Sequence, residues 1–166
     1  MDFFGHWRQD GPARPWWPKW LTHDDLRSGV PAQRRPGRPS WCYGTAGITR
    51  ALQLAASSAN DELGQAVAEE SLAACLAPEQ LARVTGPDLC HGAGGLYVTA
   101  LRAAQDALIP SIAQRLPAIA ALLTGKIARN DGSGLLTGQA GTGLALEAAR
   151  TATPPQSGWD ACLLIT

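Results

Sequence analysis

Three short segments organise this chain: WCYGTAG at 41–47, LCHGAGG at 89–95 and LLTGQAG at 135–141. Each contains Gly-x-x-Gly and leads into a stretch rich in alanine and leucine. The first glycines, Gly44, Gly92 and Gly138, are separated by 48 and then 46 residues. A period in this range is typical of stacked helical arrays in which one unit is a helix pair. We therefore predict an all-α fold of helix-pair repeats of about 47 residues.

Apolar spacing and capping residues outline the helices that follow each segment. Asn60 or Asp61 is suited to cap the second helix of the first repeat, because short polar side chains accept hydrogen bonds from a helix start. The expected helices cover about 48–56 and 61–76 in the first repeat, 95–108 and a stretch ending near 125 in the second, and 138–150 in the third. The third repeat has no clear second helix. Strand-forming residues never alternate over a useful length, so no sheet is expected.

Residues 1–40 differ in amino-acid composition from residues 41–166, and we predict that they form a separate irregular segment. They are dense in proline, glycine, arginine and tryptophan. Proline removes amide donors and blocks helix, so this segment is expected to be mostly loop. Trp16, Trp17 and Trp20 are expected to bury against the helical body.

The overall composition narrows the function classes. The 166 residues carry 14 basic and 14 acidic side chains, and this zero net charge argues against a nucleic-acid binder. No stretch approaches the roughly 20 apolar residues of a membrane span, and the start shows no signal peptide. Four cysteines without an export signal favour reduced thiols or metal ligands over disulfides, and the expected location is cytoplasmic.

Aligning the repeats on their first glycine places Cys42 opposite Cys90 and Tyr43 opposite His91. Equivalent positions of neighbouring repeats lie side by side, so Cys42, Cys90 and His91 are predicted to converge. Two thiolates and an imidazole suit Zn²⁺, and three protein ligands leave its fourth position open, as in catalytic sites. Because no CxxC pair is present, buried unreactive thiols remain the alternative.

At these residues the chain resembles the lanthionine synthetase C-like family. The resemblance is carried by Trp41-Cys42-Tyr43-Gly44, Cys90-His91-Gly92, Gly138-x-x-Gly141, and Gly158-Trp159-Asp160 before an apolar tail. It implies that residues 41–166 form the C-terminal part of an α/α toroid of inner and outer helices. It also implies that Cys42, Cys90 and His91 hold zinc.

The resemblance further implies a zinc-dependent lanthionine cyclase of lanthipeptide biosynthesis. Such enzymes add peptide cysteine thiols to dehydroalanine or dehydrobutyrine. The implied partners are a dehydrated precursor peptide and a dehydratase that supplies it. In the family, an arginine four residues before the first zinc cysteine and the tyrosine after that cysteine lie at the site. Those positions are Arg38, which could stabilise an enolate, and Tyr43, which could donate or accept a hydrogen bond.

Both residues also have an alternative, purely structural interpretation. Arg38 could belong to a solvated basic loop, and Tyr43 could be a packing residue. The family's catalytic histidine and aspartate come from repeats upstream of the WCYG motif. His6 and His23 lack the expected glycine-rich context and are not given that role. We therefore expect little or no cyclase activity from this polypeptide alone.

Three hypotheses about function follow from the sequence. The chain is a cyclase or a fragment of one, a non-catalytic zinc-bound thiol or peptide-binding protein of the same framework, or the product of a decayed or wrongly started gene. Cys75 and Cys162 have no partner in the repeat register and are expected to be buried, inert thiols.

Overall fold

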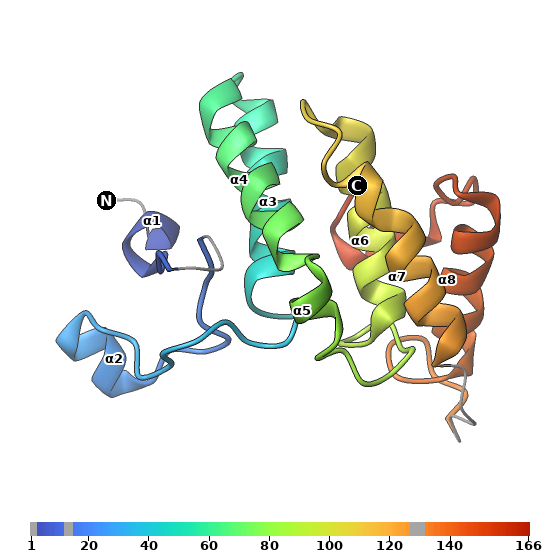
Figure 1. The fold of residues 1–166 in the computed structure, drawn as a ribbon, viewed down its shortest axis with the longest axis horizontal. Helices are drawn as coiled ribbons and strands as arrows, with labels where there is room; N and C mark the ends of the chain where they lie inside the picture. Colours follow the sequence, from blue (N-terminus) through green and yellow to red (C-terminus); the bar gives the residue numbers. More distant parts are fainter. Residues whose placement is uncertain (1–2, 12–14, 127–131) are drawn as a thin grey trace.

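The computed structural model describes residues 3–11, 15–126 and 132–166, so parts of the N-terminal segment, 1–2 and 12–14, lie outside the described residues. These described ranges contain helices and loops but no strand; one isolated antiparallel bridge joins Gln9 and Trp16. The predicted all-α fold is confirmed (Figure 1). None of the described helices has the length and apolar character needed to cross a membrane.

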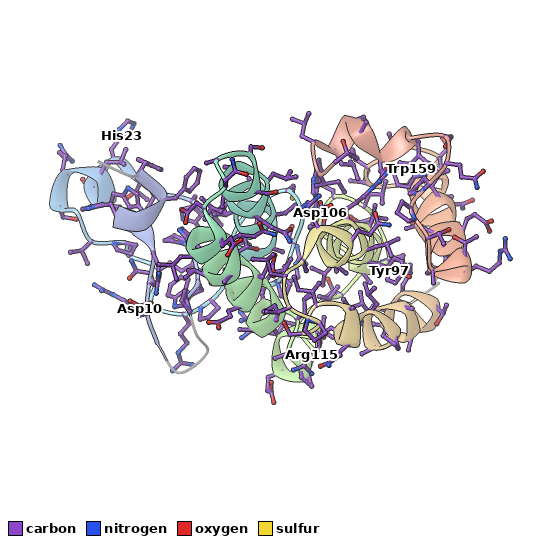
Figure 2. The ribbon with its side chains drawn as sticks, turned by 90° about the horizontal axis from the view of Figure 1, so that it is seen from above. Asp10, His23, Tyr97, Asp106, Arg115 and Trp159 are labelled. Carbon is purple, nitrogen blue, oxygen red and sulfur yellow. The ribbon has the colours of Figure 1, made fainter. Side chains whose placement is uncertain are left out.

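The helices stack as two pairs followed by a single helix (Figures 1 and 2). Helix α3 (Thr45–Ser58) packs on α4 (Glu62–Cys75), and α6 (Ala93–Asp106) packs on α7 (Leu116–Gly125). Helix α8 (Gln139–Thr151) follows and packs on α6 and α7. Each long helix lies within a few residues of its predicted range. The arrangement is consistent with a partial α/α toroid.

Local sequence explains where these helices begin. Asp61 caps α4, with its Oδ1 accepting from the Gly64 N–H at 2.9 Å, as the sequence predicted. Pro117 occupies the first turn of α7, where a missing N–H costs nothing. Within residues 41–166, three short elements were not predicted: α5 (Pro78–Leu81) and the 3₁₀ turns η1 (Ala113–Arg115) and η2 (Trp159–Leu163).

The N-terminal segment is less irregular than expected, because it contains helices α1 (Phe3–Trp7) and α2 (His23–Ser28). A capping box starts α2: Thr22 Oγ1 accepts from the Asp25 N–H, and the Asp25 carboxylate accepts from the Thr22 N–H. The spacing Thr-x-x-Asp is a signal for the start of a helix. The high proline content of residues 1–40 nevertheless led to the prediction of a loop, so α2 was missed.

The expected burial of the three tryptophans holds for two of them. Trp16 and Trp17 are buried, and the Trp17 N–H donates to Thr45 Oγ1 at the start of α3, at 3.2 Å. Trp20 is 64% exposed, so its predicted burial is wrong. Trp20 follows the segment that Trp17 attaches to α3. The Lys19 ammonium lies over its ring, 5.2 Å from the ring centroid.

Helix α6 forms the centre of the core. Because α3, α7 and α8 all pack against it, it is buried on nearly every side. The large apolar side chains that are fully buried in the core include Leu72, Leu76, Leu89, Leu96, Ile112, Ile119 and Leu123. This core holds the three glycine-containing loops at one end of the helix stack (Figure 1).

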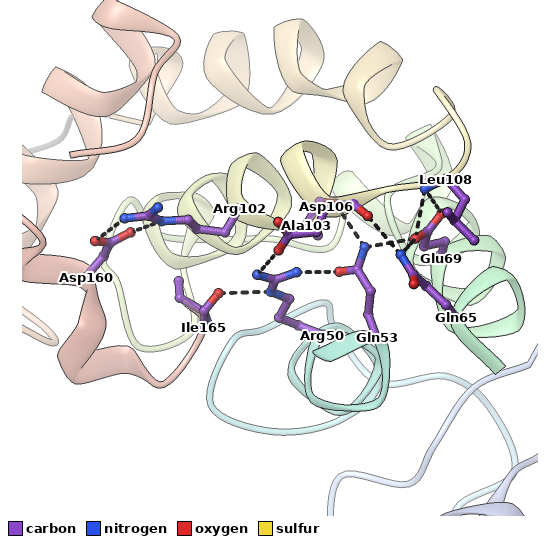
Figure 3. A network of polar contacts seen from close by, with 10 residues as sticks. All are labelled: Arg50, Gln53, Gln65, Glu69, Arg102, Ala103, Asp106, Leu108, Asp160 and Ile165. Atoms are coloured by element: carbon purple, nitrogen blue, oxygen red, sulfur yellow. Dashed lines mark hydrogen bonds and ion pairs between the residues drawn. The ribbon is translucent and has the colours of Figure 1, made fainter. Parts of the chain in front are cut away.

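A buried polar network ties the first repeat to the second and to the C-terminal tail (Figure 3). The Arg50 guanidinium is 1% exposed and donates to Gln53 Oε1, Asp106 and the Ile165 carbonyl at 2.6, 2.6 and 2.9 Å. The tail is held a second time by Arg102, whose guanidinium grips the Asp160 carboxylate with two bonds of 2.6 and 2.9 Å. Bidentate pairs of this kind fix orientation as well as charge.

Glu69 is the main hydrogen-bond acceptor at the other end of this network (Figure 3). Its fully buried carboxylate accepts from the Leu108 and Ile109 N–H groups and from the side-chain amides of Gln53 and Gln65. A buried charge needs this many donors to offset its lost hydration. The loop after α6 is thereby bound to α4.

The second glycine of each Gly-x-x-Gly segment makes the same close contact. A Cβ on Gly47, Gly95 or Gly141 would lie 2.1, 1.8 or 1.8 Å from the carbonyl oxygen six residues earlier. No side chain fits at that distance, so the loop can fold over its own helix start only if this residue is glycine. The sequence repeat is therefore a packing requirement.

Helix α8 offers a matched pair of glycines to test this requirement. Gly141→Ala should destabilise the protein by about 2 kcal/mol or more, because the backbone at Leu135 must move. Gly143 is exposed with nothing within 4 Å of its Cβ position, so Gly143→Ala should stabilise by about 0.5–1 kcal/mol. Urea unfolding of both variants measures the difference, and equal effects would contradict the account.

Candidate functional site

Backbone hydrogen bonds join the three glycine-containing loops position by position. The Cys42 N–H donates to the Cys90 carbonyl at 3.3 Å, and the Cys90 N–H donates to the Leu136 carbonyl at 2.8 Å. These three residues occupy the same place in successive repeats. Stacking therefore brings Cys42 beside Cys90 although 48 residues separate them in the chain.

This register gathers Cys42, Cys90 and His91, whose candidate ligand atoms all lie within 4.8 Å of one another. No other group of three such side chains occurs in the described part of the chain. His91 can face the same point as its neighbour Cys90 because both lie in the turn before α6, which begins only at Ala93. We call these three residues the thiol–imidazole cluster.

The cluster lies at the surface without being fully open to water. Cys42 is exposed, whereas Cys90 and His91 are half-buried. Burial, followed by the adjacent Cys42 thiol, raises the pKa of Cys90 to about 11. The His91 Nδ1 atom is buried and has no hydrogen-bond partner among the described residues. A buried nitrogen without a partner is costly, and coordination of a metal would remove that cost.

Two residues that support the cluster were missed by the sequence interpretation. Ser40 Oγ lies 3.2 Å from Cys42 Sγ and donates to the Cys90 carbonyl at 3.3 Å. Asp88 Oδ1 accepts from the His91 N–H at 2.9 Å. Both residues stand two positions before a cluster cysteine, so the repeat alignment contained the signal that could have identified them.

Arg38 and Tyr43 lie together beside the cluster. The Arg38 guanidinium donates to Tyr43 Oη and to Thr85 Oγ1, both at 3.0 Å. The Tyr43 ring stacks near the His91 ring, with centroids 6.3 Å apart and planes 22° apart. The Lys19 ammonium covers the Tyr43 ring at 4.4 Å from its centroid. Arg38 is thus held by specific bonds rather than extended into solvent.

The remaining histidines and cysteines lie elsewhere. His6 and His23 are exposed on α1 and α2. Cys75 is buried, as expected, and its burial raises the pKa of the thiol to about 12, which leaves almost no reactive thiolate at neutral pH. Cys162 is exposed, so its expected burial is wrong. The 3₁₀ turn η2 buries its neighbour Leu163 instead.

Comparison with known proteins shows which family and which solved fold this chain is similar to. The family described as "Lanthionine synthetase C-like protein" matches residues 1–164. Among solved structures, the chain is similar to nisin cyclase at 18% sequence identity with a TM-score of 0.70. That similarity covers 90% of this chain and 37% of the nisin cyclase chain. A search of curated proteins found no match.

Proposed function

This chain belongs to the lanthionine synthetase C-like protein family, and we propose that its thiol–imidazole cluster binds Zn²⁺ and receives a peptide cysteine thiol. The convergence of Cys42, Cys90 and His91 within 4.8 Å is the observation that carries the proposal. Zinc lies about 2.3 Å from sulfur and 2.0–2.1 Å from nitrogen, so the tetrahedral ligands of one ion are about 3.5–3.8 Å apart, a spacing that falls within the 4.8 Å limit for these atoms. The unpartnered His91 Nδ1 also supports the fit.

Three protein ligands leave room for a fourth, which we assign to the cysteine of a dehydrated precursor peptide. When bound, zinc would lower the pKa of that thiol and favour the nucleophilic thiolate. In the proposed addition, the sulfur bonds to the β-carbon of a dehydroamino acid and the π electrons move onto the neighbouring carbonyl as an enolate. The proton lost by the thiol is balanced by the one gained at the α-carbon.

The residues around the cluster suit the charge changes of this addition. Arg38 is a permanent cation held by Tyr43 and Thr85, so it can stabilise an enolate without reorganising. Tyr43 stacks near His91 and presents its hydroxyl toward Arg38, where it can hydrogen-bond to the peptide. Ser40 and Asp88 position the two loops that carry the cluster.

Zinc binding tests the proposal first. We expect about one zinc per chain after loading and dialysis. Cys42→Ala, Cys90→Ala and His91→Ala should each weaken binding by more than the 10–100-fold typical of residues that only support ligands. Cys162→Ala is the matched control, because it removes an exposed thiol outside the cluster. Equal zinc content in all four variants would contradict the assignment.

Ring closure tests the chemistry separately. The chain spans 37% of the nisin cyclase chain, and His6 and His23 lie outside the cluster. We propose that this polypeptide alone closes rings slowly or not at all, since it lacks a second histidine at the cluster to transfer protons. Loss of free thiols from a dehydrated precursor, followed by mass spectrometry, measures this.

That assay, combined with a measurement of peptide binding with and without zinc, separates the functional alternatives. Zinc-dependent binding of the cysteine peptide without ring closure would favour a non-catalytic zinc-bound thiol or peptide-binding protein. Rapid ring closure by this chain, lost in Arg38→Met, would show that its own residues complete the catalytic site and would contradict the expected inactivity.

A further inference from the structure

An open hollow of about 790 Å³ lies beside the thiol–imidazole cluster. Half of its ten lining residues are cationic and none is acidic. The cations are Lys19, Arg34, Arg35, Arg38 and Arg83, and the exposed ring of Trp20 lines the same space. We call this feature the cationic hollow. Such a concentration of one charge raises the local concentration of anions.

Nearby carboxylates do not form ion pairs with the cations of the hollow in the described part of the chain. Asp10 lines an adjoining hollow that shares three of these cations, but it pairs with Arg8 at 3.2 Å. Asp25 interacts electrostatically with Arg34. That carboxylate is buried and accepts from the Thr22 and Ala32 N–H groups, so it fixes the loop instead of filling the hollow.

Hydrogen bonds hold the walls of the hollow in place. Arg83 donates to the Pro36 carbonyl at 2.7 Å. Gln33 donates to the Arg35 carbonyl at 2.7 Å and accepts from the Lys19 N–H at 3.0 Å. A loop fixed in this way loses little conformational entropy when a ligand binds. The Arg34 and Arg35 side chains remain exposed and available.

Two residues of the hollow, Lys19 and Arg38, connect it to the thiol–imidazole cluster through Tyr43. Lys19 lies between the rings of Trp20 and Tyr43, at 5.2 and 4.4 Å from their centroids. Tyr43 in turn stacks near His91, and Arg38 lines the hollow while donating to Tyr43. The hollow and the cluster are therefore neighbouring features that one peptide could contact together.

We propose that the cationic hollow binds an acidic segment of the peptide whose cysteine reaches the thiol–imidazole cluster. This inference rests on the proposed function and adds how the peptide is recognised. A peptide is favoured over nucleic acid because the protein has zero net charge and the five cations of the hollow lie next to the cysteines of the thiol–imidazole cluster instead of along an extended basic face. Electrostatic complementarity of this kind contributes mainly to specificity and association rate.

Fluorescence anisotropy with a labelled, cysteine-free oligoglutamate peptide tests the proposal. Binding should weaken as salt increases, and labelled oligoglutamine should bind far more weakly. The double variant Arg34→Gln/Arg35→Gln should bind about fivefold or more weakly, as expected for two lost charge contacts. The matched control is Arg27→Gln/Arg150→Gln, which removes the same charge from exposed arginines that pair on their own helices, and should change affinity less than twofold.

The experiment distinguishes failure of the zinc proposal from failure of the peptide-binding proposal. Zinc removal by a chelator, or Cys42→Ala, should change oligoglutamate binding less than twofold, because the cations of the hollow hold the probe; a larger loss would show that its carboxylates bind the zinc instead and would overturn the proposal. Unchanged binding in Arg34→Gln/Arg35→Gln, equal binding of oligoglutamine, or tighter binding of a single-stranded oligonucleotide would each overturn the proposal. Thermal unfolding of both double variants establishes that they remain folded.

Discussion

The register of the three glycine-containing loops is the constraint on which the candidate site depends. Cys42 donates its N–H to Cys90, and Cys90 donates its N–H to Leu136, so equivalent backbone positions are bonded across three repeats. The middle repeat contributes Cys90 and His91 and bonds to both neighbours. The site is therefore a consequence of helix stacking, and it can form only where two adjacent repeats both carry ligands. Leu136 ends the series because the third repeat has an apolar side chain at that position.

The C-terminal tail reinforces the first repeat, which supplies a single ligand. Trp41 precedes Cys42 and donates its indole N–H to the Leu163 carbonyl at 2.9 Å. Arg50, one helical turn into α3, donates to the Ile165 carbonyl. The tail therefore holds the Cys42 loop and the helix that follows it, while Arg102 holds Asp160 in the tail. Residues more than 110 positions away in sequence thus help to fix the distance between the two thiols.

Most of the fold and the cluster could be predicted because they follow from the repeat. The glycine spacing located α3, α6 and α8, and alignment on Gly44 and Gly92 brought the cluster residues together. Contacts between segments without a shared period could not be predicted in this way. The contact of Arg38 with Thr85, the tail on Trp41, and the placement of Lys19 over Tyr43 depend on three-dimensional packing. Exposure of Trp20 was missed for the same reason, since composition favours burial and only the chain path decides it.

X-ray absorption at the zinc edge would test the central claim most directly, because it counts the sulfur and nitrogen atoms around the ion. For the zinc-loaded protein we predict two sulfur ligands at about 2.3 Å and nitrogen or oxygen ligands at about 2.0–2.1 Å. Cys42→Ala should leave one sulfur. A zinc environment without sulfur, or one still showing two sulfur atoms in Cys42→Ala, would contradict convergence of the two repeats on a single ion.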